Sequence, residues 1–253
     1  MISRLLRLLL VAVLLTAAVH AAPVPSVHAA AQPQAPGITI NGIGSGATSS
    51  WSIVVLLTLL TFVPSILMCM TPLLRLLIVF HFLRQALGVQ TTPSNQTLVG
   101  LALILTVFIM QPVAQVIFND AVQPLQQNKI DATEALKRAT PPMRDFMLKF
   151  VREKDAALFV ELAKEPRPAR PQDLSMRVII PAYITSELSA GFQIGAVLFL
   201  PFLVIDMVVA SITTSVGMMQ LPPVVVSTPL KLLVFVMVDG WHLLIGSLLR
   251  SFN

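Results

Sequence analysis

Few residues in this sequence could do chemistry, and most of them interrupt long apolar stretches. Glu187, Asp206 and Lys231 are such residues. A charged side chain at the centre of a bilayer costs about 2.5–3.5 kcal/mol on insertion scales, so each of these groups needs a partner of opposite charge. Lys231 and Arg177 are the candidate cations. We predict that Glu187 pairs with Lys231, either within the chain or across to a neighbouring copy, and that Asp206 belongs to the same set of intersubunit charges. The alternative is that these charges lie at interface depth without partners.

The sequence lacks the patterns expected of an enzyme or a metal site. It contains no HExxH, GxSxG, P-loop or dinucleotide-binding glycine pattern. Outside the N-terminal segment the histidines are His81 and His242, and neither has a second ligand at metal-binding spacing. Cys69 is the single cysteine, so no intramolecular disulfide can form. We therefore expect no enzymatic activity, no cofactor and no metal.

Two glycines suggest where a second segment packs closely. Gly191 and Gly195 enclose the sequence GFQIG, a small-xxx-small spacing that lets another backbone approach a helix. If the segment is helical, both glycines fall within an arc of roughly 100° that also holds Glu187 and Asp206, since each residue advances about 100°. This face is expected to meet protein.

The composition indicates a membrane protein. Apolar residues make up 55% of the 253 residues, charged residues make up 11%, and the mean hydropathy is +0.82. Four apolar regions follow the N-terminal segment: 51–80, 97–118, 178–211 and 224–249. About 20 apolar residues suffice to cross the hydrocarbon core. The predicted fold class is all-α, with membrane-associated helical hairpins kinked at proline and glycine, plus a small helical extracytoplasmic domain.

Proline sets two further expectations. Pro64 and Pro72 should kink the first apolar region, with the hydroxyls of Thr61 and Thr71 bonding to the carbonyls that lose their partners. The third region, 178–211, is too long for one straight span. We therefore expect a bend or a helical hairpin there.

The N-terminus has the form of a secretory signal: Arg4 and Arg7, a short apolar run, then small residues. An uncleaved anchor helix is the alternative. An exported N-terminus followed by four crossings would also leave the polar region outside the cytoplasm. The expected organisation is a signal peptide (1–21, cleaved between 21 and 31), a flexible exported tail (22–50), a first hairpin (51–118), a polar helical periplasmic domain with its linker (119–177), and a second hairpin (178–253).

The polar region holds most of the charge. Residues 119–177 carry 11 basic and 9 acidic groups, a net charge of +2 that does not suggest nucleic-acid binding. Apolar residues recur there at i, i+3, i+4, i+7 and i+8, which predicts one apolar helix face: Met143, Phe146, Met147, Phe150 and Val151.

The loop after the third apolar region is unusual. Its sequence, GMMQLPPVVVS (217–227), has large soft side chains where small or charged turn residues are usual. Together with 83–113, 180–212 and 217–249, it closely resembles the FliP family, the flagellar branch of the type III secretion export gate. The match runs from about Trp51 to Arg250 and weakens across the polar domain.

The resemblance implies a channel subunit of the flagellar protein export gate in the bacterial inner membrane, at the basal body. Several copies assemble with FliQ and FliR, beside FlhA, FlhB and FliO, and pass unfolded flagellar proteins. It also implies that Met218, Met219 and Gln220 form a pore gasket, with Gln220 where relatives commonly carry a third methionine. Gly217, Pro222 and Pro223 would hold the loop as a fixed spur. A ring of adaptable thioethers could close a pore by dewetting yet accept any unfolded chain.

Other readings remain open. The chain could be the virulence-type counterpart of this family, a small-solute or ion transporter with Glu187 and Asp206 as coupling carboxylates, or a scaffold that binds partners through its polar domain. The transporter reading would require an internal repeat, and the sequence shows no convincing duplication.

Overall fold

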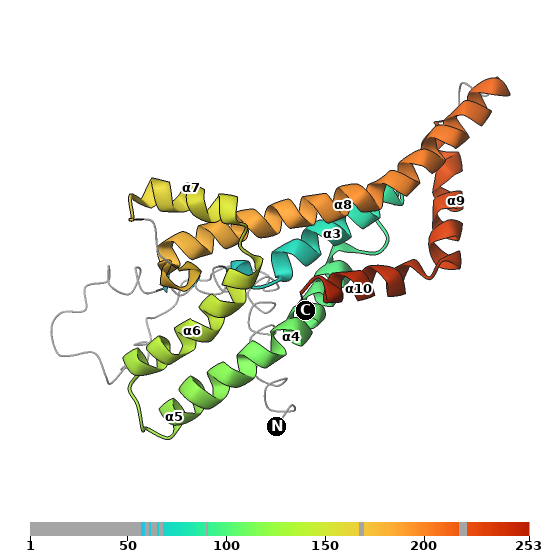
Figure 1. Cartoon of the computed structure of the whole chain (residues 1–253). Coiled ribbons are helices and arrows are strands. Elements are labelled where there is room, and N and C mark those ends of the chain that lie inside the picture. Colours follow the sequence, from blue (N-terminus) through green and yellow to red (C-terminus); the bar gives the residue numbers. More distant parts are fainter. Residues whose placement is uncertain are drawn as a thin grey trace, which may run out of the picture. The chain divides into compact units, whose positions relative to one another are not determined.

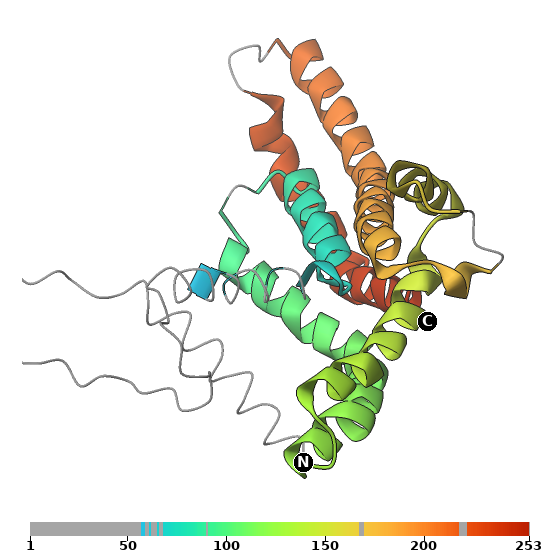
Figure 2. The same cartoon turned by 90° about the vertical axis from the view of Figure 1, so that its left-hand side faces the viewer.

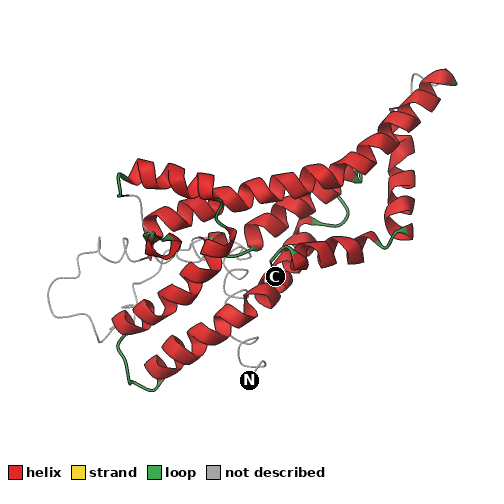
Figure 3. Ribbon diagram, in the orientation of Figure 1, coloured by secondary structure: helices red, strands yellow, loops and turns green. Residues whose placement is uncertain are grey.

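The computed structural model describes residues 57–58, 61, 65, 68–89, 91–166, 170–217 and 222–252. All of them lie in one compact unit, Ser49–Asn253. Every regular element in these ranges is a helix (Figure 3), which confirms the predicted all-α class. The segments predicted as signal peptide and exported tail, 1–21 and 22–50, fall outside the described residues.

Helix α3 (Leu73–Ala86) begins at a proline boundary. Pro72 is its N-cap residue, so the missing N–H of the proline removes no bond from the helix interior. Just before it, the Thr71 hydroxyl donates to the Met68 carbonyl at 2.7 Å, and Thr61 donates to Thr58 at the same distance. The Thr71 bond confirms the predicted role of that hydroxyl, because Met68 is four residues before Pro72 and its carbonyl loses the proline N–H. The Thr61 bond goes to a carbonyl six residues before Pro64, so it does not confirm the same role there.

Helix α4 (Asn95–Ile117) belongs to the first membrane-length span. The Ser94 hydroxyl accepts a hydrogen bond from the Thr97 N–H at 3.2 Å and caps the helix. The helix passes through Pro112 and continues as a π-helical turn (Phe118–Val122) and α5 (Gln123–Gln126). Together Asn95–Gln126 is long and apolar enough to cross a membrane.

The polar region forms two helices that pack on the long helix α8 (Met176–Ser215). They are α6 (Ala132–Phe150), which Asp131 caps through the Glu134 N–H, and α7 (Glu153–Ala163). A 3₁₀ turn follows at Pro171–Asp173. Phe146 and Met147 are buried, and the other three residues of the predicted apolar face are partly buried in the same cluster, which also contains Tyr183 of α8. The apolar face of α6 is therefore confirmed.

A bend or a hairpin was expected in the third apolar region, and helix α8 (Met176–Ser215) excludes the hairpin. It is one continuous helix of 40 residues that runs through Pro181 and Pro201 (Figure 1). Each proline removes one backbone hydrogen bond, but the bonds on either side and the packing of α3, α6, α7 and α9 along α8 support the helix.

The fourth apolar region is also different from the prediction, because it contains two helices. These are α9 (Pro223–Met237) and α10 (Gly240–Arg250), bent by 65° at the break between them. Asp239 adopts the left-handed conformation at φ 51°, which ends the first helix. The described ranges thus hold two membrane-length helices, or up to three if the bent pair counts as one span, and the expected four are not confirmed.

Helix α3 lies at the centre of the apolar core. It packs against α8 and α4, and Figures 1 and 2 both show it beside α8. The core also takes in side chains from α9 and α10, including Phe235, Leu244 and Leu248. Gly191 and Gly195 of α8 allow the close approach of α3. A Cβ at Gly195 would lie 2.5 Å from Phe82 Cδ2, and one at Gly191 would lie 3.1 Å from Ile78 Cβ.

Replacing Gly195 by valine should therefore push α3 away from α8. We expect a loss of roughly 1–3 kcal/mol in the free energy of unfolding, the usual effect of overpacking a core. Thermal unfolding of the purified chain in detergent measures it. Gly100→Ala in α4 is the matched control, because a Cβ there meets nothing within 4 Å, and it should leave the transition unchanged or raise it slightly. Equal effects of the two changes would contradict this packing.

Candidate functional site

The candidate gate loop joins α8 to α9. Residues 218–221 lie outside the described residues, so the predicted gasket of Met218, Met219 and Gln220 has no structural account here. The residues on either side are described. Gly217 has φ 78°, a left-handed conformation that favours glycine. Pro222 is the extended N-cap residue of α9, and Pro223 is the first residue of that helix.

The surface next to this loop is apolar. Ile212, Val216, Val224 and Val225 are all exposed there. The neighbouring hydroxyls bond back to carbonyls of their own helices: Thr213, Thr214 and Ser215 in α8 and Thr228 in α9. Because these hydroxyls are already satisfied, the two helix ends present mainly methyl groups to their surroundings.

A buried ion pair fixes α3 to α8. Arg75 Nε donates to Glu187 Oε2 at 2.9 Å, and Arg75 Nη2 lies 2.5 Å from Glu187 Oε1. The Glu187 side chain is 0% exposed and that of Arg75 is 7% exposed. Such a bidentate pair has the preferred geometry of arginine and carboxylate.

The C-terminal end of the chain completes the surroundings of Arg75. Arg75 Nη1 donates to Ser251 Oγ at 3.1 Å, and the guanidinium carbon lies 4.0 Å from the centre of the Phe252 ring. The Phe150 ring at the end of α6 is 5.5 Å away on the same cation. Arg75 thus connects α3, α6, α8 and the C-terminal residues.

A second ion pair joins α8 to α9. Lys231 Nζ donates to Asp206 Oδ2 at 2.6 Å and to the Ala86 carbonyl at 3.0 Å, while the Ser227 hydroxyl donates to Asp206 Oδ1 at 2.6 Å. Lys231 is buried, so its charge is held at the point where α3, α8 and α9 meet.

The predicted pair of Glu187 with Lys231 is therefore wrong within the chain. Asp206 lies 12 residues before Met218 and Lys231 lies 12 residues after Met219, so an antiparallel hairpin brings these two residues opposite each other. Glu187 is 19 residues before Asp206, about 28 Å away along the helix. Its partner is Arg75, which lies 112 residues away in the sequence. The equal distances of Asp206 and Lys231 from the loop could have predicted their pairing from the sequence. No residue close to Glu187 in the sequence indicated that its partner is Arg75.

A polar network holds α7 on α8. Arg152 Nε and the Ser186 hydroxyl both donate to Asp155 Oδ2, at 2.7 and 2.6 Å, and Arg152 Nη2 donates to the Ser189 hydroxyl at 2.5 Å. Burial by itself would raise the pKa of Asp155. The hydrogen bonds from Ser186 and Arg152, with the nearby charge of Arg152, outweigh that effect and hold the pKa of this carboxyl below its ordinary value of 3.8.

The remaining candidate chemistry is sparse. His81 and His242 are both exposed. Within the part of the chain that the structure describes, no group of three or more metal-binding side chains comes together. The ion pairs and hydrogen bonds described above can hold the helices in position, and the ends of α8 and α9 can expose apolar surface.

Removing Arg75 should leave Glu187 buried without a partner. We expect Arg75→Met to lower the free energy of unfolding by about 3–5 kcal/mol, and Arg75→Met with Glu187→Leu to recover most of that loss. Chemical unfolding in detergent measures both. Arg138→Ala is the control, because its pair with Glu134 is half-exposed and is worth under about 1 kcal/mol. A double variant as unstable as the single one would contradict this account.

The stability of the folded chain should depend on pH through the protonation of Asp155. Since its pKa is lower in the folded chain than in the unfolded chain, the stabilisation is fully present above pH 3.8 and disappears as the pH falls through the lower folded value. Asp155→Asn should be less stable than the parent chain near neutral pH, and the difference should shrink as the pH falls below the ordinary value. Thermal unfolding across this range tests it, and a difference that stays constant with pH would contradict the role of this carboxylate.

Comparison with known proteins identifies the family. The family described as "FliP family" matches residues 56–248. "Flagellar biosynthetic protein FliP" of Pectobacterium carotovorum subsp. carotovorum is 47% identical over 232 residues, which cover 90% of this chain and 88% of that protein. The protein of the same name from Bacillus subtilis (strain 168) is 48% identical over 205 residues, with coverage of 81% and 93%. The one from Rhizobium meliloti (strain 1021) is 43% identical over 221 residues, with coverage of 86% and 90%. The chain therefore belongs to the FliP family.

Proposed function

We propose that this chain is a non-enzymatic subunit of a flagellar protein export channel, present in several copies and assembled with FliQ and FliR. The membership of the chain in the FliP family and the printed name of its relatives, flagellar biosynthetic protein, support the flagellar role. Unfolded flagellar proteins are the proposed cargo, and other export proteins of the membrane, such as FlhA, FlhB and FliO, are the proposed neighbours.

The length of α8 carries the argument for assembly. At 1.5 Å per residue its 40 residues extend about 60 Å, about twice the thickness of the hydrocarbon core. Large apolar side chains are nevertheless exposed from Leu188 to Val216, a stretch of about 42 Å that is longer than the hydrocarbon core is thick. Lipid tails cannot cover the whole of such a helix if it stands upright. Neighbouring protein subunits therefore account for the rest of this surface.

The gate is the second part of the proposal. The exposed apolar ends of α8 and α9 carry the loop that contains Met218, Met219 and Gln220. Several copies of this loop, gathered around one axis, would form a ring of flexible apolar side chains. Such a ring excludes water and ions by dewetting, and it yields to a polypeptide because methionine has three rotatable bonds.

Orientation and location follow from the N-terminal pattern. The signal-like segment supports an exported start of the mature chain. Two crossings within 51–118 would then leave the polar helices α6 and α7 on the periplasmic side of the bacterial inner membrane. The long exported segment before residue 51 favours the flagellar apparatus over the virulence-type counterpart. The transporter alternative loses support because Glu187 and Asp206 already have cationic partners within the chain.

Truncating the methionines should open the seal without dismantling the assembly. We expect the double variant Met218→Ala and Met219→Ala to form a complex of normal mass and to export, but to leak small ions. Val224→Ala with Val225→Ala is the control, because it also shortens two exposed apolar side chains near the loop. Ion leakage across the membrane of cells that carry each variant is the measurement. If the methionine variant stays as tight as the parent while exporting normally, the gasket role is wrong.

Gln220→Met tests the same ring from the other direction. A third apolar side chain per copy should tighten the resting seal or leave it unchanged. Greater leakage than in the parent chain would contradict the dewetting argument. The mass of the complex, purified with its co-encoded neighbours, tests the multi-copy assembly separately.

A further inference from the structure

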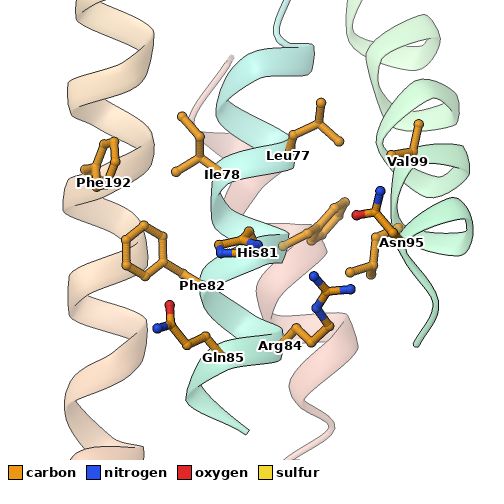
Figure 4. A pocket seen from close by; sticks show the side chains of 11 residues that line it. Leu77, Ile78, His81, Phe82, Arg84, Gln85, Asn95, Val99 and Phe192 are labelled. Carbon is orange, nitrogen blue, oxygen red and sulfur yellow. The ribbon is translucent and has the colours of Figure 1, made fainter. Parts of the chain in front are cut away.

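A half-open groove of about 560 Å³ lies beside the C-terminal half of α3, against the start of α4 and Phe192 of α8 (Figure 4). Its walls are not uniform. Leu77, Ile78, Val99 and Phe192 line one part, and Arg84 lies among the polar residues of the other. The function proposed above makes no use of this groove.

The lining changes from apolar to polar along α3. Leu77, His81 and Gln85 follow one another at a spacing of four residues, so they form a stripe about 12 Å long on one helix face. Asn95, the first residue of α4, lies across from the polar end of this stripe (Figure 4). Asn95 also begins the membrane-length helix Asn95–Gln126, so the polar end of the groove lies where that helix enters the membrane.

The charge of the groove is positive. Arg84 makes no ion pair with any residue that the structure describes. No acidic residue lines the groove, and His81, Gln85 and Asn95 add side chains that can donate hydrogen bonds. A cation surrounded by donors suits an anionic group that carries several acceptor oxygens.

We propose that this groove binds an acidic phospholipid, with the phosphate against Arg84 and His81 and an acyl chain along Leu77, Val99 and Phe192. The graded lining matches an amphiphile whose charged end sits at the membrane surface. This inference depends on the membrane location of the chain and on no other part of the proposed function.

The test uses the full chain, purified in detergent and equilibrated with an equal mixture of phosphatidylglycerol and phosphatidylcholine. Native mass spectrometry then counts the lipids retained. The parent chain should retain phosphatidylglycerol in preference. Arg84→Gln should weaken that retention about tenfold, the effect of losing one charge-assisted hydrogen bond, and should leave phosphatidylcholine unchanged. Arg250→Gln is the matched control, because Arg250 is an exposed arginine outside the groove.

A second variant tests the apolar part. Val99→Trp should fill the groove and reduce retention of both lipids, with an unchanged thermal transition showing that the chain still folds. Equal retention by Arg84→Gln and the parent, or an equal loss in Arg250→Gln, overturns the proposal. So does a photo-crosslinker at position 99 that captures a protein instead of a lipid in cells with the assembled apparatus. A parent chain that assembles and exports but retains both lipids equally would refute this inference and leave the proposed function standing.

Discussion

Arg75 and Glu187 hold together the part of the chain on which the other helices depend. The pair lies between α3 and α8, and both groups are almost completely buried. Separating two such charges leaves each without compensation in a medium of low dielectric constant, so the two helices keep one relative position. Because Phe150 and Phe252 also contact the guanidinium, the polar helices and the end of the chain are fixed by the same cation. The packing of Gly191 and Gly195 against α3 continues this contact along α8.

The second ion pair fixes a different pair of helices from the first. Lys231 and Asp206 align the hairpin of α8 and α9 at half its length, and Lys231 also reaches the Ala86 carbonyl at the end of α3. Beyond this point the two helices lack further charged contacts within the described ranges, and their exposed side chains are mostly apolar. Helices α8 and α9 are thus fixed at the ion pair. Between that pair and the loop, their apolar side chains stay uncovered in a single copy. This division fits a protein whose outer surface is completed by other subunits.

Much of this could be read from the sequence, and the failures share a physical cause. Local signals gave correct predictions: the apolar spacing of α6 and the bond of the Thr71 hydroxyl before α3 both involve residues close together in the sequence. The lengths of the apolar regions predicted an all-α chain. The continuity of α8 through Pro181 and Pro201 was missed because its support comes from helices distant in sequence. The pair of Arg75 with Glu187 spans 112 residues and depends on how α3 crosses α8, which no spacing rule gives. The proposal of a gate loop came from resemblance to a family, since chemistry by itself allowed a simple turn.

The unbroken course of α8 has a mechanical consequence. One end of the helix carries α7 through the contacts of Arg152 with Ser186 and Ser189, and the other end carries the loop at Gly217. A hairpin or a flexible hinge in between would absorb a displacement of α7, whereas a single hydrogen-bonded rod transmits torque over its whole length. A displacement of α7 can therefore reach the loop through α8, as through a lever. The fixed crossing with α3 serves as its fulcrum.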